Sequence, residues 1–440
     1  MKIVHLLNHF FPYQTAGTEV YVWALSKQLI DMGIDSLVIT PNYGSNQFET
    51  YYYDSIRVVR YPETSILDRD LIMGKRKTEG LAAFNQVLED ERPDVIHFHE
   101  IAAGNGITHH HVKIAKSCQS RIVVTFHLSG NSCRTGTMMY KGRTPCNGKI
   151  NELKCSSCYL HAKGYAAVSS LLVPISTGLD RIGIDTTIWN NKLGTALATS
   201  RLIRQFSEQL HDLENDADAL VVLTDWYKKV LLLNDIESRK IHLIPQALPV
   251  RDEISRLLTK RESSSSLRLM FLGRISPYKG LHVLLRAIRA FKVSEVTLDI
   301  YGQSNDHVYE NECRSIADGM QNIRWMGLLP KQQVVATMRL YDALCLCSTF
   351  SEMSPLVIQE AFAAGIPVIA SNAHGNTEQI KHSVNGLIFK MNDVESLRKQ
   401  LELCIQNHKM IERLSAAVAP PDDFSVVGKA YYNLYKNLQV

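Results

Sequence analysis

The feature that most constrains this chain is residues 351–371, SEMSPLVIQEAFAAGIPVIAS, where two carboxylates interrupt a pattern of a helix followed by a buried strand. Glu352 and Glu360 lie eight positions apart, a little over two turns of helix. Proline is tolerated in the first turn of a helix but not further in, so Pro355 predicts a helix that starts near Ser354. One acid then lies ahead of the helix, and the other projects from its second turn.

The start of this helix is a candidate anion site. The free backbone N–H groups of a helix N-terminus and the positive end of its dipole face whatever lies ahead of it. Glu360 could accept hydrogen bonds from both hydroxyls of a ribose, while Glu352 could reach the hydroxyls of a second sugar. The arrangement suits a nucleotide sugar, and it assigns donor binding to Met353, Ser354, Pro355, Leu356 and Glu360.

Two glutamates with seven residues between them, followed by Ala364-Gly365-Ile366-Pro367-Val368, resemble the signature of retaining GT-B glycosyltransferases of family 4. The resemblance implies an α/β chain of two Rossmann-like parallel-sheet domains that face each other across a cleft. It implies sugar transfer with retention, from a UDP- or GDP-type sugar to a saccharide or lipid-linked hydroxyl, in the synthesis of a cell-surface polysaccharide or glycoconjugate. The alternative is a surface acid beside a satisfied acid in an ordinary helix.

A second loop with binding chemistry lies between a β-rich run at 267–272 and a helical pattern at 281–291. It reads GRISPYKG and carries two cations, Arg274 and Lys279. Fixed cations at a helix N-terminus are what a diphosphate needs, and the loop resembles the family's donor-diphosphate loop. The alternative is a capped turn with solvated side chains. No G-x4-GK[ST] motif occurs there, so it is not a Walker loop.

The N-terminal half shows the same rhythm of strand and helix. β-rich runs at 2–7 and 36–40 flank a helical pattern at 19–32, which predicts a right-handed β-α-β unit. Gly17 ends the loop before that helix, where a glycine lets the backbone approach a phosphate of the donor. The loop resembles the family's glycine loop, although Ala16 replaces the first glycine. A plain turn is the alternative.

Three histidines lie at the ends of expected strands. PDVIHFH at 93–99 and RIVVTFH at 121–127 read as buried strands. Ligands of open α/β sheets bind outside the carboxyl ends of the strands, so His97, His99 and His127 are placed where chemistry can occur. The resemblance implies that the histidine ending the second strand contacts the transferred sugar. His127 and Glu352 are therefore our catalytic candidates, and a structural role for His127 is the alternative.

A segment at 129–164 departs from this rhythm and contains four cysteines within 26 residues: Cys133, Cys146, Cys155 and Cys158. The last two form C-x2-C, which suits a four-thiolate site for Zn(II), and an iron–sulfur cluster would use the same ligands. The segment has few apolar residues, so a structural metal would supply folding free energy that its core cannot. Reduced unligated thiols and disulfides are the alternatives.

The domain boundaries follow from composition. Residues 251–266 are polar, end in four serines and predict a linker. We expect an acceptor-side domain at 1–250, which carries the Cys-rich insertion at 129–164, and a nucleotide-sugar domain at 267–422. An amphipathic pattern at 426–438 predicts a last helix, and the resemblance implies that residues 423–440 cross back to the first domain.

Composition narrows the function further. The chain has 440 residues, 45% apolar and 21% charged, and a net charge of +4 without a dense Lys/Arg run, so nothing calls for nucleic acid. The N-terminus is too polar for a signal peptide, and no apolar run approaches the roughly 18 residues of a membrane helix. We expect a cytoplasmic protein. The resemblance adds a peripheral contact with the inner face of a membrane.

Two other classes of function stay open at this point. The chain could be a nucleotide-sugar epimerase, which would act without an acceptor, or a phosphorylase-like GT-B enzyme. It could also be a non-catalytic sugar-binding or scaffold subunit on the same fold. The joint presence of His127, Arg274, Lys279, Glu352 and Glu360 favours the transferase. The cations and N–H groups can meet the charge of a leaving diphosphate, so the chemistry needs no cofactor.

Overall fold

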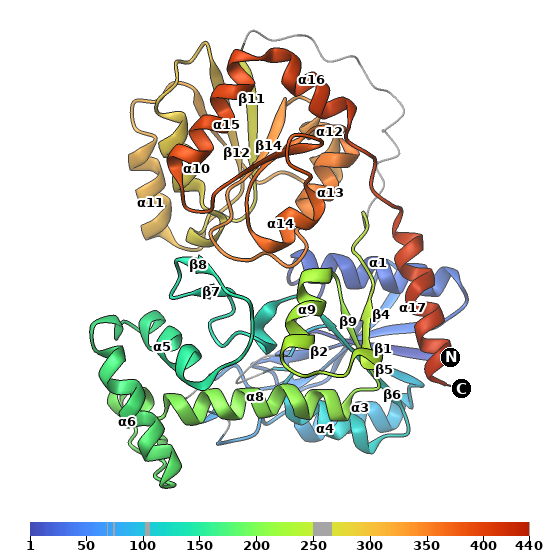
Figure 1. The fold of residues 1–440 in the computed structure, drawn as a ribbon. Coiled ribbons are helices and arrows are strands. Elements are labelled where there is room, and N and C mark those ends of the chain that lie inside the picture. The colour runs from blue at the N-terminus through green and yellow to red at the C-terminus, as the bar shows by residue number, and fades with distance from the viewer. Residues whose placement is uncertain (68, 74, 102–105, 250–265, 440) are drawn as a thin grey trace. The chain divides into compact units, whose positions relative to one another are not determined.

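The computed structural model describes residues 1–67, 69–73, 75–101, 106–249 and 266–439. The chain divides into two compact units, with Met1–Pro245 and Phe424–Val440 in unit 1 and Gln246–Asp423 in unit 2. Each unit is a β-sheet with helices packed on both faces (Figure 1). The α/β class with two parallel-sheet domains is therefore confirmed. Of the expected linker at 251–266, only Ser266 lies within the described residues.

Unit 1 contains an eight-stranded sheet in the order β10-β9-β6-β5-β1-β2-β4-β3. All neighbours pair in parallel except β3 with β4. Its strands are β1 (Lys2–Leu6), β2 (Asp35–Tyr43), β3 (Glu49–Tyr53), β4 (Ile56–Glu63), β5 (Val95–Phe98), β6 (Arg121–Phe126), β9 (Ala219–Val222) and β10 (Ile241–Leu243). The chain leaves β1 in both directions, so the switch point of this sheet lies between β1 and β5.

The helices of unit 1 include the last helix of the chain. They are α1 (Gly17–Asp31), α2 (Arg69–Ile72), α3 (Leu81–Glu91), α4 (His109–Ser117), α5 (Glu152–Ala162), α6 (Ser169–Arg181), α7 (Lys192–Leu197), α8 (Thr199–Asp216), α9 (Asp225–Leu233) and α17 (Phe424–Leu438). Helix α17 lies beside α1 (Figure 1), and Tyr21 Oη donates a hydrogen bond to Tyr431 Oη at 3.1 Å. None of the described helices is long and apolar enough to cross a membrane.

Unit 2 contains a fully parallel six-stranded sheet in the order β13-β12-β11-β14-β15-β16. Its strands are β11 (Leu267–Leu272), β12 (Val296–Tyr301), β13 (Ile323–Gly327), β14 (Ala343–Leu346), β15 (Val368–Ser371) and β16 (Gly386–Phe389). Its helices are α10 (Leu281–Ile288), α11 (His307–Ile316), α12 (Val334–Met338), α13 (Leu356–Ala363), α14 (His374–Gln379), α15 (Val394–Gln406) and α16 (His408–Ala416). The switch point lies between β11 and β14.

The core of unit 2 follows from the alternation of side chains along its strands. Leu269 and Phe271 of β11 join one buried cluster, whereas Met270 between them joins the cluster on the opposite face. The same alternation sends Cys345 and Leu346 of β14 to opposite faces. Because both faces are covered, the strands read as nearly continuous apolar runs.

Candidate functional site

Two loops meet at the switch point of unit 2, one after β11 and one after β14. Thr349 N–H donates a hydrogen bond to the Tyr278 carbonyl oxygen at 2.8 Å. A Cβ on Gly280 would lie 1.9 Å from the Cys347 carbonyl oxygen, and Gly280 has a φ of +67°. Only glycine fits this position, so the sequence fixes close contact between the two loops. Ligands of such sheets bind at this point.

The charged residues of the two loops pair with each other. Lys279 Nζ lies 2.5 Å from Glu352 Oε1, and Ser348 Oγ donates a second hydrogen bond to the same oxygen at 2.7 Å. The two charged side chains are 23% and 9% exposed, so this is a partly desolvated ion pair. Arg274, from the same loop as Lys279, is exposed. The structure therefore brings Lys279 and Glu352 together and leaves Arg274 facing solvent.

Helix α13 begins at Leu356, with Pro355 in the cap position. The helix therefore starts two residues later than Ser354, the position that the sequence predicts, because proline takes the extended backbone of a cap at φ −68° and ψ 119°. Met353 and Ser354 belong to the preceding loop. That loop is held by α14, since Gly375 N–H donates to the Glu352 carbonyl oxygen at 3.1 Å and a Cβ on Gly375 would lie 2.4 Å from it.

Glu360 lies in the second turn of α13, as expected, and it has a half-buried basic neighbour, Lys331, that the sequence did not reveal. Burial raises the pKa of Glu360 to about 7, although the charge of Lys331 acts to lower it. Burial likewise lowers the pKa of Lys331 to about 8, with Glu360 opposing. The charge of Lys331 thus favours the ionised form of Glu360, and the charge of Glu360 favours the protonated form of Lys331. A ligand that donates hydrogen bonds to the carboxylate would favour the ionised form further.

The histidines of unit 1 gather at its switch point. His5 of β1 and His97 of β5 are register partners, and both are fully buried. His97 lies inside its strand, with Nδ1 2.7 Å from Tyr435 Oη and Nε2 2.7 Å from Thr125 Oγ1. The expectation that His97 is open to chemistry is therefore wrong, because neighbours from β6 and α17 occupy both of its nitrogens.

His99 and His127 do follow the carboxyl ends of β5 and β6. His99 Nδ1 lies 3.0 Å from His127 Nε2, and His99 Nε2 lies 3.0 Å from His5 Nδ1. Burial lowers the pKa of His127 to about 3 and that of His5 to about 3. Burial, together with the neighbouring histidines, holds the pKa of His99 well below its usual value. All three imidazoles are therefore neutral near pH 7. His127 is the partly exposed member.

His5, His97 and His99 form the one group of three or more His, Cys, Asp or Glu in the described residues whose ligand atoms lie within 4.8 Å of one another. Every ring nitrogen of these three residues has a hydrogen-bond partner except His5 Nε2, which has none among the described residues. The group is therefore organised as a hydrogen-bond network. Binding a metal there would break several of these bonds.

Gly17 is the first residue of α1, and an added Cβ would meet nothing within 4 Å. The carboxylate of Glu19 already lies at this helix start, where it accepts hydrogen bonds from Ala16 N–H at 3.0 Å and Gln14 Nε2 at 2.6 Å. An anion near Gly17 would therefore meet a carboxylate. This local charge does not favour a phosphate, although the backbone leaves room for one.

The Cys-rich insertion brings its cysteines to one cavity but not to metal-binding distance. Cys133 follows η1 (Ser129–Asn131), Cys146 follows the hairpin of β7 (Met139–Tyr140) and β8 (Thr144–Pro145), and Cys155 and Cys158 lie on α5. All four line a cavity of about 30 Å³. No three of their sulfurs lie within 4.8 Å of one another in the described residues. The expected four-thiolate cluster is not assembled.

The physical reason lies in the local hydrogen bonds of the thiols. Three of the sulfurs accept hydrogen bonds from backbone N–H groups at 3.2 to 3.4 Å, and the pairs are Met138 to Cys133, Lys141 to Cys158 and Asn151 to Cys155. Cys133 and Cys155 thus accept from residues near them in sequence, whereas Cys158 of α5 accepts from the turn between β7 and β8. Burial raises the pKa of Cys155 and of Cys158 above the usual thiol value.

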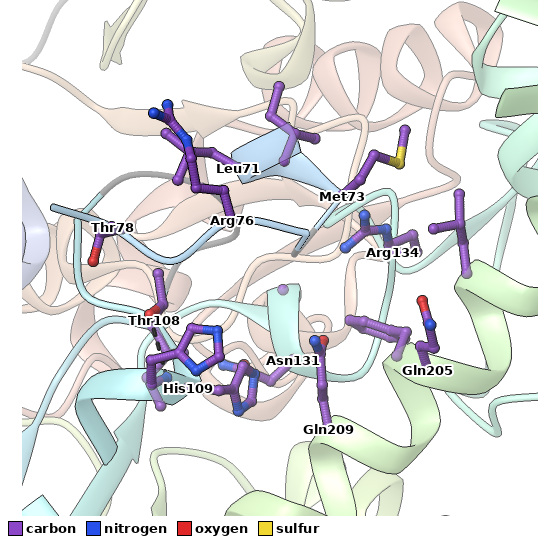
Figure 2. A pocket seen from close by; sticks show the side chains of 16 residues that line it. Leu71, Met73, Arg76, Thr78, Thr108, His109, Asn131, Arg134, Gln205 and Gln209 are labelled. Atoms are coloured by element: carbon purple, nitrogen blue, oxygen red, sulfur yellow. Dashed lines mark hydrogen bonds between the residues drawn. The ribbon is translucent and has the colours of Figure 1, made fainter. Parts of the chain in front are cut away.

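A second cavity of unit 1, of about 110 Å³, lies between α8, the start of α4, the loop after β6, and α2 with the residues that follow it. Figure 2 shows amide and basic side chains that reach it from these segments, with the apolar Leu202 and Phe206 of α8 among its lining residues. Arg76, Thr78, Thr108 and His110 line it as well, and five further residues with hydrogen-bonding capacity are Asn131, Arg134, Gln205, Gln209 and His109. The side chains of these five residues make no hydrogen bond to other described residues, whereas Arg76 pairs with Glu79, and none of the described lining residues is acidic.

Several of these groups carry little signal in the sequence. Ser348, Lys331, His5 and the amides of α8 belong to no motif that singles them out, and Gln205 and Gln209 read as the polar face of an amphipathic helix. A signal existed only for Ser348, which directly follows a buried strand that precedes the acidic pair.

Comparison with known proteins places the chain in a family. Residues 259–419 match the model "Glycosyl transferases group 1", and residues 15–170 match "Glycosyltransferase Family 4". A phosphatidyl-myo-inositol mannosyltransferase of Mycobacterium leprae is 30% identical over 177 residues, 39% of this chain and 46% of that protein. The amylovoran biosynthesis glycosyltransferase AmsK of Erwinia amylovora is 28% identical over 142 residues, which are 30% of this chain and 34% of that protein.

Among solved structures, HepE of Anabaena in complex with UDP has a TM-score of 0.62 and 15% identity, over 99% of this chain and 100% of that one. This likeness extends over the whole fold. The chain spans about half the length of the curated relatives that it matches. The two family models match successive parts of the chain and together cover most of it. The chain belongs to the GT-B glycosyltransferases of family 4.

Proposed function

We propose that the chain transfers a sugar from a nucleotide-diphosphate sugar to a hydroxyl acceptor, with retention of configuration. The observation that carries the proposal is the meeting of Lys279 and Glu352 at the switch point of unit 2, 2.5 Å apart. A cation there can balance the diphosphate, and the carboxylate can accept hydrogen bonds from the sugar. The UDP bound to HepE of Anabaena supports a donor of the UDP type.

Each donor-site residue has a role in this proposal. Lys279 and Arg274 balance the diphosphate charge, together with the backbone at Met353, Ser354 and Leu356, and Pro355 fixes the turn before α13. Three further roles follow from the chemistry of the residues and from the family: Glu360 accepts from the ribose hydroxyls, and Glu352 and His127 orient the transferred sugar. The family alone suggests that Gly17 borders the phosphates, because the Glu19 carboxylate beside it does not favour an anion.

In the reaction, the bond between the anomeric carbon and the diphosphate oxygen breaks, and a bond from the acceptor oxygen forms on the same face. The proton of the acceptor hydroxyl passes to the leaving diphosphate. Positive charge near that oxygen lowers the barrier, because it stabilises the charge that develops there. We assign no enzymic nucleophile.

We propose that the acceptor occupies the 110 Å³ cavity of unit 1 (Figure 2). Amides beside an apolar wall suit a saccharide, and Arg134 favours one that carries a negative group, such as a phosphate or a uronate. The names of the mannosyltransferase of Mycobacterium leprae and the amylovoran enzyme of Erwinia amylovora point to glycolipid and polysaccharide synthesis. A lipid-linked saccharide would bring the protein to a membrane surface.

The acceptor proposal is tested with the double variant Arg134→Met/Gln209→Leu. Donor cleavage in the absence of acceptor should stay within two-fold of the wild type, whereas transfer to a phosphorylated or uronic-acid saccharide should fall at least ten-fold. The matched control is Lys113→Met, which removes an exposed cation of α4 that pairs with Asp212. Unchanged transfer in the double variant would remove the cavity from the acceptor site.

The transferase is distinguished from its alternatives by product analysis. Release of nucleotide diphosphate together with a sugar of retained configuration supports transfer. Interconversion of two nucleotide sugars without acceptor would support an epimerase, and binding without any turnover would support a sugar-binding subunit.

We keep the structural metal of the Cys-rich insertion as a proposal, supported by four thiols around one cavity. Tetrahedral zinc at about 2.3 Å from each sulfur requires sulfurs about 3.8 Å apart. Binding would therefore draw the sulfurs together, and their backbone N–H partners could remain, because a metal-bound thiolate still accepts hydrogen bonds. No step of the transfer reaction depends on this ion.

A further inference from the structure

Three histidines of unit 1 form a continuous chain that ends at the candidate sugar-contacting residue. His5 Nδ1 lies 3.0 Å from His99 Nε2, and His99 Nδ1 lies 3.0 Å from His127 Nε2. His97 does not compete for these positions, because Tyr435 and Thr125 engage its two nitrogens. The chain therefore runs from inside the sheet at β1 to the carboxyl end of β6.

The protons of this chain are coupled. A neutral imidazole carries one N–H donor and one acceptor nitrogen. The middle ring, His99, must therefore donate to one neighbour and accept from the other if both bonds form. Two arrangements are left. Either all protons point from His5 toward His127, or all point from His127 toward His5.

The far end of the chain distinguishes the two arrangements. His5 Nε2 is buried and has no hydrogen-bond partner among the described residues. If the protons point toward His5, this atom carries a buried N–H without an acceptor. If they point toward His127, it is a bare acceptor. Buried unpaired N–H groups are the rarer and more costly of the two.

We infer that His5 and His99 are positioning residues that hold His127 as the tautomer with its proton on Nδ1. His127 Nε2 is committed to accepting from His99, so Nδ1 is the nitrogen left for a ligand. His127 then presents an N–H donor at the strand end. This deepens the proposed function and rests on it for the identity of the ligand, a sugar oxygen. It also means that His127 donates to the sugar and does not act as a general base.

The direct test is the tautomer of His127 in the full chain. Protein labelled with 15N in its histidines is examined by long-range 1H–15N correlation, in which the carbon-bound ring protons report both nitrogens. The signals of His127 are assigned from their loss in His127→Asn. We expect Nδ1 protonated and Nε2 bare. A proton on Nε2 would overturn the inference, and this reading needs no substrate or activity.

A variant pair tests the role of His5. His5→Phe removes the donor to His99, so His127 should show a mixture of tautomers and donor cleavage should fall about ten-fold in kcat/KM, the effect of one hydrogen bond. His5→Asn keeps an N–H near the position of Nδ1 and should restore both. Thr125→Val is the control, since it removes a partner of His97 and leaves the chain of three intact.

The outcomes separate this inference from the proposed function. If His127 keeps the same single tautomer in His5→Phe, the inference is contradicted, whatever the rate of donor cleavage. If His5→Phe does not fold, the wild-type spectrum alone decides. If the wild type shows the Nδ1 proton but cleaves no nucleotide sugar, the inference stands and the proposed function fails.

Discussion

Lys279 and Glu352 neutralise each other, so a bound diphosphate must share the lysine with the carboxylate. Ser348 keeps Glu352 Oε1 in place through a second hydrogen bond, which limits how far the carboxylate can follow the lysine. The pair is thus pre-organised: the cation is fixed before the donor arrives, and little ordering remains for the bound state.

Lys279→Ala should reduce kcat/KM for donor cleavage by ten- to over a hundred-fold. The lost contact is charge-assisted, about 1.5–3 kcal/mol, and the variant also leaves Glu352 without its cation. Steady-state kinetics with a nucleotide sugar measure the effect. Arg286→Ala is the matched control, because Arg286 is a half-exposed cation of α10 that pairs with Glu312, and its rate should stay within two-fold. A normal rate for Lys279→Ala would remove Lys279 from the site.

Donor affinity should depend on the protonation of Glu360, whose pKa burial raises to about 7. Only the ionised carboxylate accepts from both ribose hydroxyls. Donor affinity should therefore be highest above pH 7 and should fall about ten-fold for each pH unit below it. Calorimetric titration between pH 5.5 and 8.5 measures this. Glu360→Gln should bind weakly and without this pH dependence.

Lys331 provides a matched control for the pH profile. Its charge acts to lower the pKa of Glu360, so Lys331→Met should move the midpoint of the profile to higher pH. A profile in the wild type that is flat across pH 7 would count against contact between Glu360 and the donor.

At the scale of elements, the four thiols of the Cys-rich insertion line one small cavity. If it takes a structural zinc ion, purified protein should contain about one zinc per chain, and Cys155→Ser/Cys158→Ser should abolish this and lower the unfolding temperature. The control is Cys118→Ser, which changes a thiol of α4's cap outside the cavity. Four reactive thiols and no bound metal in fresh protein would contradict the metal proposal.

Periodicity and turn residues carried most of the element assignments, since apolar runs bounded by Gly and Pro mark buried parallel strands well. The start of α13 was placed two residues early because Pro355 is accepted both in the cap and in the first turn. The sequence singles out the two candidate donor loops because the residues of each loop lie close together in sequence. The acceptor cavity could not, because Asn131, Gln209 and His109 come together only through the fold.

The histidine chain shows the same limit. A strand-end histidine is visible in sequence, but the partners of His97 lie on β6 and on the last helix, more than 300 residues away in the case of Tyr435. A sequence pattern gives the strand that a residue occupies, whereas burial and partners depend on which strands become neighbours. This is why His97 was wrongly considered open and His5 was overlooked.

At the scale of the whole molecule, unit 1 should lose stability in acid before unit 2. Burial lowers the pKa of His5, His97, His99 and His127 below that of an unfolded histidine, near 6.5. The unfolded chain therefore binds more protons below pH 6.5. The stabilisation is fully present above that pH and falls as the pH drops, by about 1.4 kcal/mol per pH unit for each histidine.

Urea titrations at pH 7.5 and 5.5 measure this difference. Trp325 is the one tryptophan of unit 2. In Trp325→Phe, all tryptophan fluorescence therefore comes from unit 1, where Trp23, Trp189 and Trp226 lie. The unfolding midpoint of unit 1 should fall at pH 5.5. An equal midpoint at the two pH values would show that the histidines are not buried in their neutral form.

The most direct test of the central claim is thermal unfolding of the purified chain with UDP, GDP or ADP and their sugars, beside the variant Arg274→Ala/Lys279→Ala. A ligand at about a hundred times its dissociation constant adds roughly 2.7 kcal/mol to stability, a readable shift in Tm. The account predicts that one nucleotide series, UDP by preference, stabilises the wild type and not the variant. No shift with any nucleotide, or an equal shift in the variant, would contradict a donor site at the two loops of unit 2.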